Sequence, residues 1–382
     1  MIEPKLRFKK DDGSDFPDWE EKKLGDVCDT LTYGMNAAAV KFDGENKYIR
    51  ITDIDDESHC YKNDELVSPD GELDNKYLVC ENDILLARTG ASVGKSYLYN
   101  KEDGKLYYAG FLIKAHVKSE NSKFIFFQTL TERYDKWVKI TSMRSGQPGI
   151  NANEYSDFTM NVPSLPEQQK IADFLSTIDT IIEKQQATVS AWEERKKGVM
   201  QKLFSQEVRF KADDGSDFPD WEEKKLQSIV GKISSGKDKN EEGSAILYGS
   251  TGPIGTCANS TYKGRKILIA RVGANAGALQ YVLEDCGVTD NTLIITDTNS
   301  CNFKWLYCNL EYKNIGKMRF GGGQPLVTGT MLHELRMNVP CADEQQKIAD
   351  CLSALDTVIQ KQKETLEKWQ ELKKGLLQQM FV

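Results

Sequence analysis

Two stretches of this chain occur twice, and this repetition constrains the fold more than any other feature. The sequence DDGSDFPDWEEKKL stands at Asp11–Leu24 and again, unchanged, at Asp213–Leu226, an offset of 202 residues. A second sequence, EQQKIADFLSTIDTIIEKQ, begins at Glu167, and a close copy begins at Glu344, an offset of 177. Because the offsets differ, the two halves agree at their ends and differ in length between them. The repeats indicate two related halves, each with a connector, a variable segment and a long periodic segment.

The two offsets also indicate how the halves are joined. By the connector offset Met1 is equivalent to Leu203, and by the second offset Phe381 is equivalent to Phe204. The chain therefore starts in the repeat where it ends. This predicts a circular, pseudo-twofold arrangement that is cut once, in which each connector links the end of one helix to the start of the opposite variable segment.

Both copies of the second repeat have the heptad pattern of a coiled coil, with steps that alternate between four and three residues. The first seam contains Ile171, Leu175, Ile178, Ile182, Gln185, Val189, Trp192, Lys196, Val199 and Leu203. The second contains Ile348, Leu352, Leu355, Ile359, Gln362, Leu366, Trp369, Lys373, Leu376 and Met380. Gln and Lys interrupt both seams at equivalent places, and polar seam residues fix the register of paired helices.

The length of these periodic segments favours a pair of helices that bury each other's seams. Each has about 38 residues and would span roughly 57 Å as a helix. Helices of globular proteins average about 11–12 residues. The alternative is two independent amphipathic helices, each lying on its own domain.

The variable segments share one informative motif. DILLARTGASVG runs over Asp83–Gly94 and KILIARVGANAG over Lys266–Gly277, so that Arg88 matches Arg271. Both predict a buried strand followed by a glycine-rich turn. Around them, KYIRITDI, LYYAGFLIKAHV and NTLIITD are typical of strands, and SKFIFFQTLTERYDKWVKI and FKWLYCNLEY are typical of helices. We therefore expect two mixed α/β domains of one fold with different surfaces.

The segment GASVGKS at Gly90–Ser96 raises the alternative of a phosphate-binding loop. It is one residue short between its glycines, and the equivalent segment, GANAGAL, has no lysine. A structural turn after a strand is therefore the better interpretation.

A second matched loop precedes each long helix. KITSMRSGQPGINANEY begins at Lys139 and KMRFGGGQPLVTGTML at Lys317. Arginine can fork to guanine and glutamine to adenine in the major groove, while lysine can hold phosphate. Both copies have Gln-Pro, which favours a turn that docks the domain on the helix, whereas the flanking Ile140–Ser145 and Arg319–Gly322 differ. The candidate DNA-contacting residues are Lys139, Arg144, Ser145, Gln147, Lys317, Arg319, Gln324, Arg88 and Arg271.

Composition argues against catalysis, metal binding and membrane insertion. The chain has only three histidines, and its nine cysteines are never spaced as CxxC, which favours a reducing cytosol without disulfides or zinc. A run of eighteen apolar residues is missing from the sequence. The PDWEEKK of the connector resembles a nuclease motif, but its spacing is too short. The net charge is −8, yet residues 25–165 carry −6 and residues 227–342 carry +3.

The combination of two unlike domains, repeated connectors and helices that open EQQKIAxxLSxxD resembles the specificity subunit of type I restriction-modification systems along the whole chain. The resemblance implies target recognition domains that each read one part of an asymmetric, bipartite DNA site, and a spacer of paired helices. It also implies that seam-bearing helices dock two modification subunits, which carry S-adenosylmethionine and methylate adenine N6. A motor-nuclease restriction subunit would join for cleavage, and this chain itself would hold no cofactor and catalyse nothing.

The resemblance divides the chain into six segments. They are a connector (1–24), target recognition domain 1 (25–165), spacer helix 1 (166–204), the repeated connector (205–226), target recognition domain 2 (227–342) and spacer helix 2 (343–382). The alternative function is a two-headed protein-binding scaffold on a coiled coil that does not bind DNA.

Overall fold

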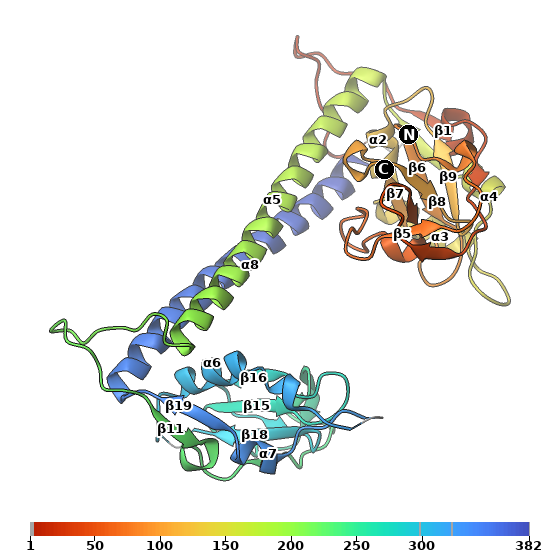
Figure 1. The fold of residues 1–382 in the computed structure, drawn as a ribbon. Helices are drawn as coiled ribbons and strands as arrows, with labels where there is room; N and C mark the ends of the chain where they lie inside the picture. Colours follow the sequence, from red (N-terminus) through yellow and green to blue (C-terminus); the bar gives the residue numbers. More distant parts are fainter. Residues whose placement is uncertain (1–3, 298, 322–323, 382) are drawn as a thin grey trace. The chain divides into compact units, whose positions relative to one another are not determined.

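The structure, a computed structural model, describes residues 4–297, 299–321 and 324–381. Its packing separates two units: unit 1 is residues 4–185 with residues 365–381, and unit 2 is residues 186–364. Each unit contains one connector, one mixed α/β domain and one half of each long helix (Figure 1). The architecture is therefore mixed α/β, as the sequence predicts.

The two long helices are α5 (Leu165–Phe204) and α8 (Ala342–Met380), of 40 and 39 residues. In unit 1, the first half of α5 and the last half of α8 contribute Leu175 and Leu377 to one apolar cluster. In unit 2, the last half of α5 and the first half of α8 do the same, and Leu203 is among the residues there. The helices therefore run antiparallel within each unit, and the alternative of two independent helices is wrong.

Every residue of the two heptad seams is buried or half-buried. The seam lysines pair with acidic residues of the opposite helix. The Lys196 Nζ lies 2.8 Å from an Asp356 carboxylate oxygen in unit 2, and the Lys373 Nζ lies 2.6 Å from an Asp179 oxygen in unit 1. The two pairs are equivalent by the 177-residue offset, so the polar seam positions are ion pairs that the antiparallel register brings together.

The unit 2 pair shows which force dominates at this position. Burial favours the neutral form of Lys196, but its hydrogen bond to Asp356 and the charges of Glu311 and Asp356 outweigh burial and raise the pKa of the ammonium. Burial also acts to raise the pKa of Asp356, yet its hydrogen bonds from Lys196 and Lys304 lower it overall. Each partner is therefore held in its charged form.

The domain of unit 1 contains a four-stranded antiparallel sheet in the order β2-β9-β6-β7, and the strand pairs β3-β5 and β4-β8. Its strands are β2 (Thr32–Tyr33), β3 (Ala39–Lys41), β4 (Lys47–Ile49), β5 (Val67–Pro69), β6 (Asp83–Ala87), β7 (Ser96–Leu98), β8 (Leu106–Tyr108) and β9 (Leu112–His116). Its helices are α1 (Leu24–Val27), α2 (Ser122–Gln128), α3 (Glu132–Thr141) and α4 (Ala152–Ser156). Every residue of the central strand β6 is buried, which explains its nearly unbroken apolar run.

The domain of unit 2 contains a four-stranded sheet of equivalent strands in the same order, β12-β18-β15-β16, and a three-stranded sheet, β14-β13-β17. Its strands are β12 (Ser234–Ser235), β13 (Ala245–Gly249), β14 (Gly252–Cys257), β15 (Lys266–Ala270), β16 (Leu279–Val282), β17 (Gly287–Val288) and β18 (Thr292–Thr296). Its helices are α6 (Phe303–Lys313) and α7 (Gly329–His333). The matched motif thus forms the central strand of both sheets, followed in each by the predicted turn.

Three predicted elements are divided in the structure, and the first of them is the strand-like segment 47–54, which becomes β4 and a short 3-10 helix at Ile51–Asp53. The helical segment 122–140 becomes α2 and α3, because the Thr131 hydroxyl accepts a hydrogen bond from the Tyr134 main chain (3.2 Å) and caps a new helix. The strand-like segment 106–117 becomes β8 and β9 with a turn at 109–111 between them.

Each connector ends in a strand that pairs with the strand preceding a long helix. In unit 1, β1 (Glu20–Lys23) pairs with β10 (Thr159–Val162), and in unit 2, β11 (Glu222–Lys225) pairs with β19 (Arg336–Val339). Both pairs are antiparallel, and in both the first residue of the connector strand faces the last residue of its partner. The repeated EEKK therefore forms the strand at the start of each domain and pairs with the strand at the end of the same domain.

The glutamate that opens each EQQK motif binds the connector's arginine. Glu167 is fully buried and accepts from Arg7 Nε (3.1 Å) and Nη2 (2.9 Å). Glu344 is also fully buried and accepts from Arg209 at 3.1 and 2.8 Å. The arginine before each copy of the repeated connector sequence, Arg7 or Arg209, thus makes a charge-assisted, two-point contact with the start of a long helix.

The first glutamine of each EQQK motif binds the domain. The Gln168 amide donates to Pro163 O (2.8 Å), and its oxygen accepts from the Asn121 main chain (2.9 Å). Gln345 makes the same two bonds, to Pro340 O (2.9 Å) and from the Asn302 main chain (2.8 Å). Both asparagines cap a domain helix, α2 or α6. The motif therefore joins connector, domain and long helix in each unit.

The circular repeat pattern is also visible near the two ends of the chain. In unit 1 the Leu6 main-chain N–H donates to Gln379 O at 2.9 Å, and in unit 2 the Val208 N–H donates to Lys202 O at 3.2 Å. These four residues correspond by the two offsets. In unit 2 the bonded residues lie six positions apart in one continuous stretch of chain, whereas in unit 1 the equivalent residues come from the two ends of the sequence. This is the circular arrangement that the repeats predict.

Candidate nucleic-acid interface

Three loops meet in each domain, and two of them carry most of the candidate DNA-contacting residues; we call the place where the three loops meet the apex. The loops are the glycine turn (88–94 in unit 1, 271–277 in unit 2), the strand turn (109–111, 289–291) and the Gln-Pro loop (142–150, 319–327). Positions 322 and 323 of the second Gln-Pro loop, including Gly322 of the variable flank, lie outside the described residues.

Main-chain hydrogen bonds join the three loops of unit 1. The Gly90 N–H donates to Pro148 O at 3.0 Å, and the Ile150 N–H donates to Arg88 O at 2.9 Å. The Arg88 N–H in turn donates to Phe111 O at 3.0 Å. Arg88 therefore stands at the centre of the apex, between the Gln-Pro loop and the strand turn.

Unit 2 repeats these bonds one for one. The Gly273 N–H donates to Pro325 O, the Val327 N–H donates to Arg271 O, and the Arg271 N–H donates to Asn291 O, each at 2.9 Å. Because the main-chain frame is the same, the two apices are one scaffold that carries different side chains.

The glycines of the glycine turn are required by its backbone. Gly90 and Gly94 have φ of 79° and 91°, and Gly273 and Gly277 have 84° and 92°, a region that side-chain-bearing residues seldom adopt. The Pro148 and Pro325 carbonyls accept from this turn. These bonds connect the Gln-Pro loop to the glycine turn of the same domain. The sequence had instead favoured a Gln-Pro turn that docks the domain on the long helix.

The central arginines have different surroundings in the two units. The Arg88 guanidinium lies 4.8 Å from the centre of the Tyr33 ring and donates to Gly110 O at 3.4 Å. The Arg271 side chain is half-exposed and has no hydrogen-bond or ion-pair partner among the described residues. Arg88 is thus held in place before any ligand binds, and Arg271 is available to one.

The arginines of the Gln-Pro loops are exposed but engaged. Arg144 contacts Glu154 (2.5 Å) and the main-chain oxygens of Thr141 and Met143 (2.7 and 2.9 Å). Arg319 donates to Ala274 O of the glycine turn (2.8 Å). Both guanidiniums are therefore tethered at the apex surface.

The remaining candidates lie at the surface of the same loops or just before them. Glu334, the acidic residue that follows α7, pairs with Lys225 at 2.5 Å. The exposed candidates are Lys139, at the end of α3, and Ser145, Gln147, Lys317 and Gln324. The structure brings the candidates of each unit to that unit's apex; their contacts with DNA stay a prediction.

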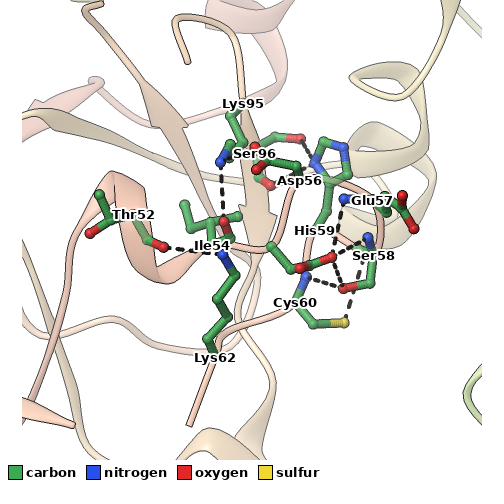
Figure 2. A network of polar contacts seen from close by, with 11 residues as sticks. Thr52, Ile54, Asp56, Glu57, Ser58, His59, Cys60, Lys62, Lys95 and Ser96 are labelled. Carbon is green, nitrogen blue, oxygen red and sulfur yellow. Dashed lines mark hydrogen bonds and ion pairs between the residues drawn. The ribbon is translucent and has the colours of Figure 1, made fainter. Parts of the chain in front are cut away.

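Lys95, the lysine of the phosphate-loop alternative, is already occupied (Figure 2). Its ammonium donates to Ile54 O at 3.1 Å, forms an ion pair with Asp56, and is mostly buried. Ser96 begins strand β7, whereas a phosphate-binding loop leads into a helix whose N-terminus faces the phosphate. The glycine turn of unit 1 is therefore structural.

His59 belongs to the same polar network and holds a loop in place (Figure 2). Its Nδ1 lies 2.9 Å from Ser96 O. The Ser96 hydroxyl in turn lies 2.7 Å from the Thr129 hydroxyl. The ring packs edge-on against Phe126, with centroids 6.3 Å apart. Burial lowers the pKa of His59, so the neutral imidazole is the form that fits this loop.

Metal-binding clusters and membrane-spanning helices are both absent from the residues that the structure describes. In residues 4–297, 299–321 and 324–381, His, Cys, Asp and Glu do not gather in groups of three or more that could hold a metal ion. Within the same residues, the helices are too short or too polar to cross a membrane.

Sequence reasoning missed the strand turn, and with it Phe111 and Asn291. These positions differ between the halves, so the repeats do not mark them. A signal existed nonetheless: Gly34 and Gly236 correspond by the connector offset, and a Cβ at either would lie 2.2 Å from Ala109 O or 2.4 Å from Thr289 O. Two matched glycines thus allow the close approach of this turn in both domains.

Fold and apex together define a class of protein with two α/β domains of one fold, each joined by a repeated connector to long antiparallel helices. The family described as "Type I restriction modification DNA specificity domain" matches residues 17–190 and 219–368. These segments cover most of the chain.

Whole-chain relatives agree with this match. The type I restriction enzyme MjaVIII specificity subunit of Methanocaldococcus jannaschii is 26% identical, over 94% of this chain and 92% of that protein. The putative MjaX specificity subunit of the same organism is also 26% identical, over 94% and 93%.

Solved structures show the same fold. The crystal structure of a type I restriction-modification system S subunit from M. genitalium matches with a TM-score of 0.60 at 17% identity, over 100% of this chain and 99% of that one. A chain from a study of complex assembly and conformational transition of the type I R-M system matches with a TM-score of 0.53 at 17% identity, over 95% and 97%. The chain belongs to the type I restriction-modification DNA specificity family.

Proposed function

We propose that this chain is the sequence-reading subunit of a type I restriction-modification complex and that each apex reads one part of a bipartite DNA site. The observation that carries the proposal is the repeated apex. Its main-chain frame is the same in both units, while its exposed side chains differ. Because the side chains differ, the two parts of the site should differ, and the whole site should be asymmetric.

The chemistry of the complex is proposed to reside on other subunits. Modification subunits would bind S-adenosylmethionine and methylate adenine, restriction subunits would cleave, and this chain would contribute recognition and docking alone. The relatives' names as specificity subunits of restriction enzymes support this division of labour. The scaffold alternative, a two-headed module that binds only proteins, has no support from the family or its relatives.

A methylome tests the function directly. The chain would be expressed with the modification subunit of its own system in a strain that lacks other adenine methylation. The expected result is methylated adenine in one asymmetric two-part motif with a constant gap. Methylation without a motif, or a single undivided motif, would contradict the proposal.

The tethered arginines give a residue-level test. If Arg144 contacts phosphate, Arg144→Ala should weaken binding to all duplexes alike and lower the salt slope of log affinity by about one unit. If it contacts a base, the variant should relax one position of the site at a cost of about 1–3 kcal/mol. Arg319→Ala makes the same test in unit 2.

A melting curve of each variant separates these roles from a structural one. If Arg144 only pairs with Glu154 and does not contact DNA, Arg144→Ala should lower the stability of the chain and leave the DNA affinity of the folded complex unaltered. If both variants bind like the parent, at every salt concentration and with the same motif, the apex is not the DNA surface.

A further inference from the structure

At one position of the strand turn, the two domains make the same main-chain hydrogen bond but have different side chains. Phe111 and Asn291 are equivalent, because their carbonyls accept from the N–H groups of Arg88 and Arg271, at 3.0 and 2.9 Å. The next residue confirms the alignment of the strand turns. The Gly34 N–H donates to Leu112 O, and the corresponding Gly236 donates to Thr292 O, at 3.1 and 3.0 Å.

Both side chains point outward from their domain. Phe111 is 63% exposed, and Asn291 is exposed with no hydrogen-bond partner for its amide among the described residues. A single exposed apolar side chain is ordinary on a protein surface. What distinguishes these two residues is their place in the chain fold: each accepts, through its main-chain carbonyl, a hydrogen bond from the arginine that the two domains share.

A residue that is the same in both domains cannot distinguish two half-sites. Arg88 and Arg271 therefore suit a contact that both half-sites offer, such as a phosphate, which positions a protein without specifying sequence. Discrimination must come from neighbouring side chains that differ. On the strand turn, unit 1 has Ala109-Gly110-Phe111 where unit 2 has Thr289-Asp290-Asn291.

We propose that Phe111 and Asn291 are the specificity-determining residues of the strand turns, with Phe111 contacting a thymine methyl group and Asn291 pairing with adenine. The inference rests on the proposed function. An asparagine amide can donate to adenine N7 and accept from its N6 amino group, and an aromatic side chain can pack on the thymine methyl. The strand turn is rigid, because its main chain is bonded to the glycine turn, so either side chain would meet the base at a defined place.

The test uses the full chain together with the modification subunit of its system. The parent site is first selected from random duplexes. Asn291→Ala should reduce discrimination at one adenine of the half-site read by unit 2, by about 5- to 150-fold. Replacing that adenine by 7-deazaadenine should weaken binding of the parent and should not weaken binding of Asn291→Ala further.

Phe111→Ala is tested with uracil in place of thymine, which removes only the methyl group. The parent should lose about fourfold in affinity at one thymine of the half-site read by unit 1, the contribution of one buried methyl group. Phe111→Ala should bind the uracil and thymine duplexes equally. Each variant should keep the other half-site unchanged, and this also shows that the variant is folded.

Matched controls lie outside the apex. Leu283→Ala removes a side chain that is 61% exposed, and Asn259→Ala removes an exposed amide. Both should select the parent site. If the parent selects a two-part site and Phe111→Ala and Asn291→Ala select the same one, this inference is overturned and the proposed function stands. If the parent selects no site, the proposed function itself fails.

Discussion

Two fully buried carboxylates, Glu167 and Glu344, fix the start of each long helix. Glu344 accepts from Arg209 and also from the Trp221 indole N–H at 2.9 Å. A buried charge is tolerable only when it is paired and hydrogen-bonded, and the arginine of the connector supplies both. At the residue scale, the arginine just before each repeated connector sequence is therefore the counter-ion of the helix glutamate that it contacts.

We predict that Glu344→Gln lowers the free energy of unfolding by about 1.5–3 kcal/mol, because the neutral amide gives up the charge-assisted hydrogen bonds from Arg209, whose guanidinium keeps a weaker contact with Asp220 at 3.7 Å. Denaturant titration of the full chain, followed by the transition that reports unit 2, measures the loss. Glu334→Gln is the matched control: Glu334 pairs with Lys225 at the surface, and its removal should change stability little. Equal losses in both variants would show that the buried pair has no special role.

His59 predicts a dependence of stability on pH. Burial lowers its pKa below the ordinary 6.5, an effect that the nearby Lys95 and Lys373 charges reinforce, while the Ser96 carbonyl and Asp135 oppose it. The unfolded chain thus binds a proton at higher pH than the folded chain does. The stability is fully present above pH 6.5 and is lost as the pH falls from there through the folded pKa.

His59→Asn should remove this part of the pH dependence, because asparagine does not titrate and tolerates the positive φ of 58° at this position. The melting temperature of the transition that reports unit 1 should fall less between pH 7 and pH 5 in the variant than in the parent. His333→Asn, in unit 2, serves as the control for loss of an imidazole. A variant with the parent's full pH dependence would assign the effect to other groups.

At the scale of elements, the pairing of the two long helices depends on the apolar residues of their seams, and their register depends on the polar residues that interrupt the seams. The seam alone would permit several registers. The Lys196–Asp356 and Lys373–Asp179 pairs form in one antiparallel register, since each joins the last half of one helix to the first half of the other. Their burial makes a shifted register costly, because it would leave lysine on the seam without a partner.

A double-mutant cycle on Lys373 and Asp179 tests this role. We expect the pair Lys373→Met and Asp179→Leu to show a coupling energy of about 0.5–3 kcal/mol in the free energy of unfolding. The exposed pair Lys363–Glu193 is the control and should couple more weakly, because solvent screens its charges. If the losses of unfolding free energy in the two single variants simply add in the double variant, the ion pair does not set the register and the apolar seam alone does.

At the scale of the whole molecule, each unit carries its own connector, domain and helix halves. Each domain closes on its own strand pair, β1–β10 or β11–β19, and on its own EQQK motif. Because these contacts lie within a unit, a domain can change without disturbing the other unit's packing. This modularity is what a two-part reader requires.

We predict that replacing residues 25–165 by the equivalent segment of another family member changes one half-site and preserves the other. The contacts of Glu167 and Gln168 should accept the new domain if it keeps the capping asparagine that Asn121 provides here. Methylome sequencing of cells with the chimaera reads both half-sites at once. A change in both half-sites would show that the two units do not read independently.

Sequence alone determined the parts of this protein that are periodic or repeated. The heptads predict two long paired helices, the offsets predict a circular order, and the matched DILLA and KILIA predict the central strands. These inferences depend on local pattern, which a helix or a buried strand expresses along its own length. They also placed Arg88 and Arg271 at equivalent positions.

Tertiary structure decided which loops meet and which side chains face outward together. Phe111 reaches Arg88 from 23 residues away, and Pro148 reaches Gly90 from 58 residues away, so no local pattern records either contact. The partners of Glu167 and Lys196 were likewise settled by packing between distant segments. Side chains that differ between the halves leave no mark in a repeat, and for that physical reason the strand turn emerged only from the shared main-chain hydrogen bonds of the two domains.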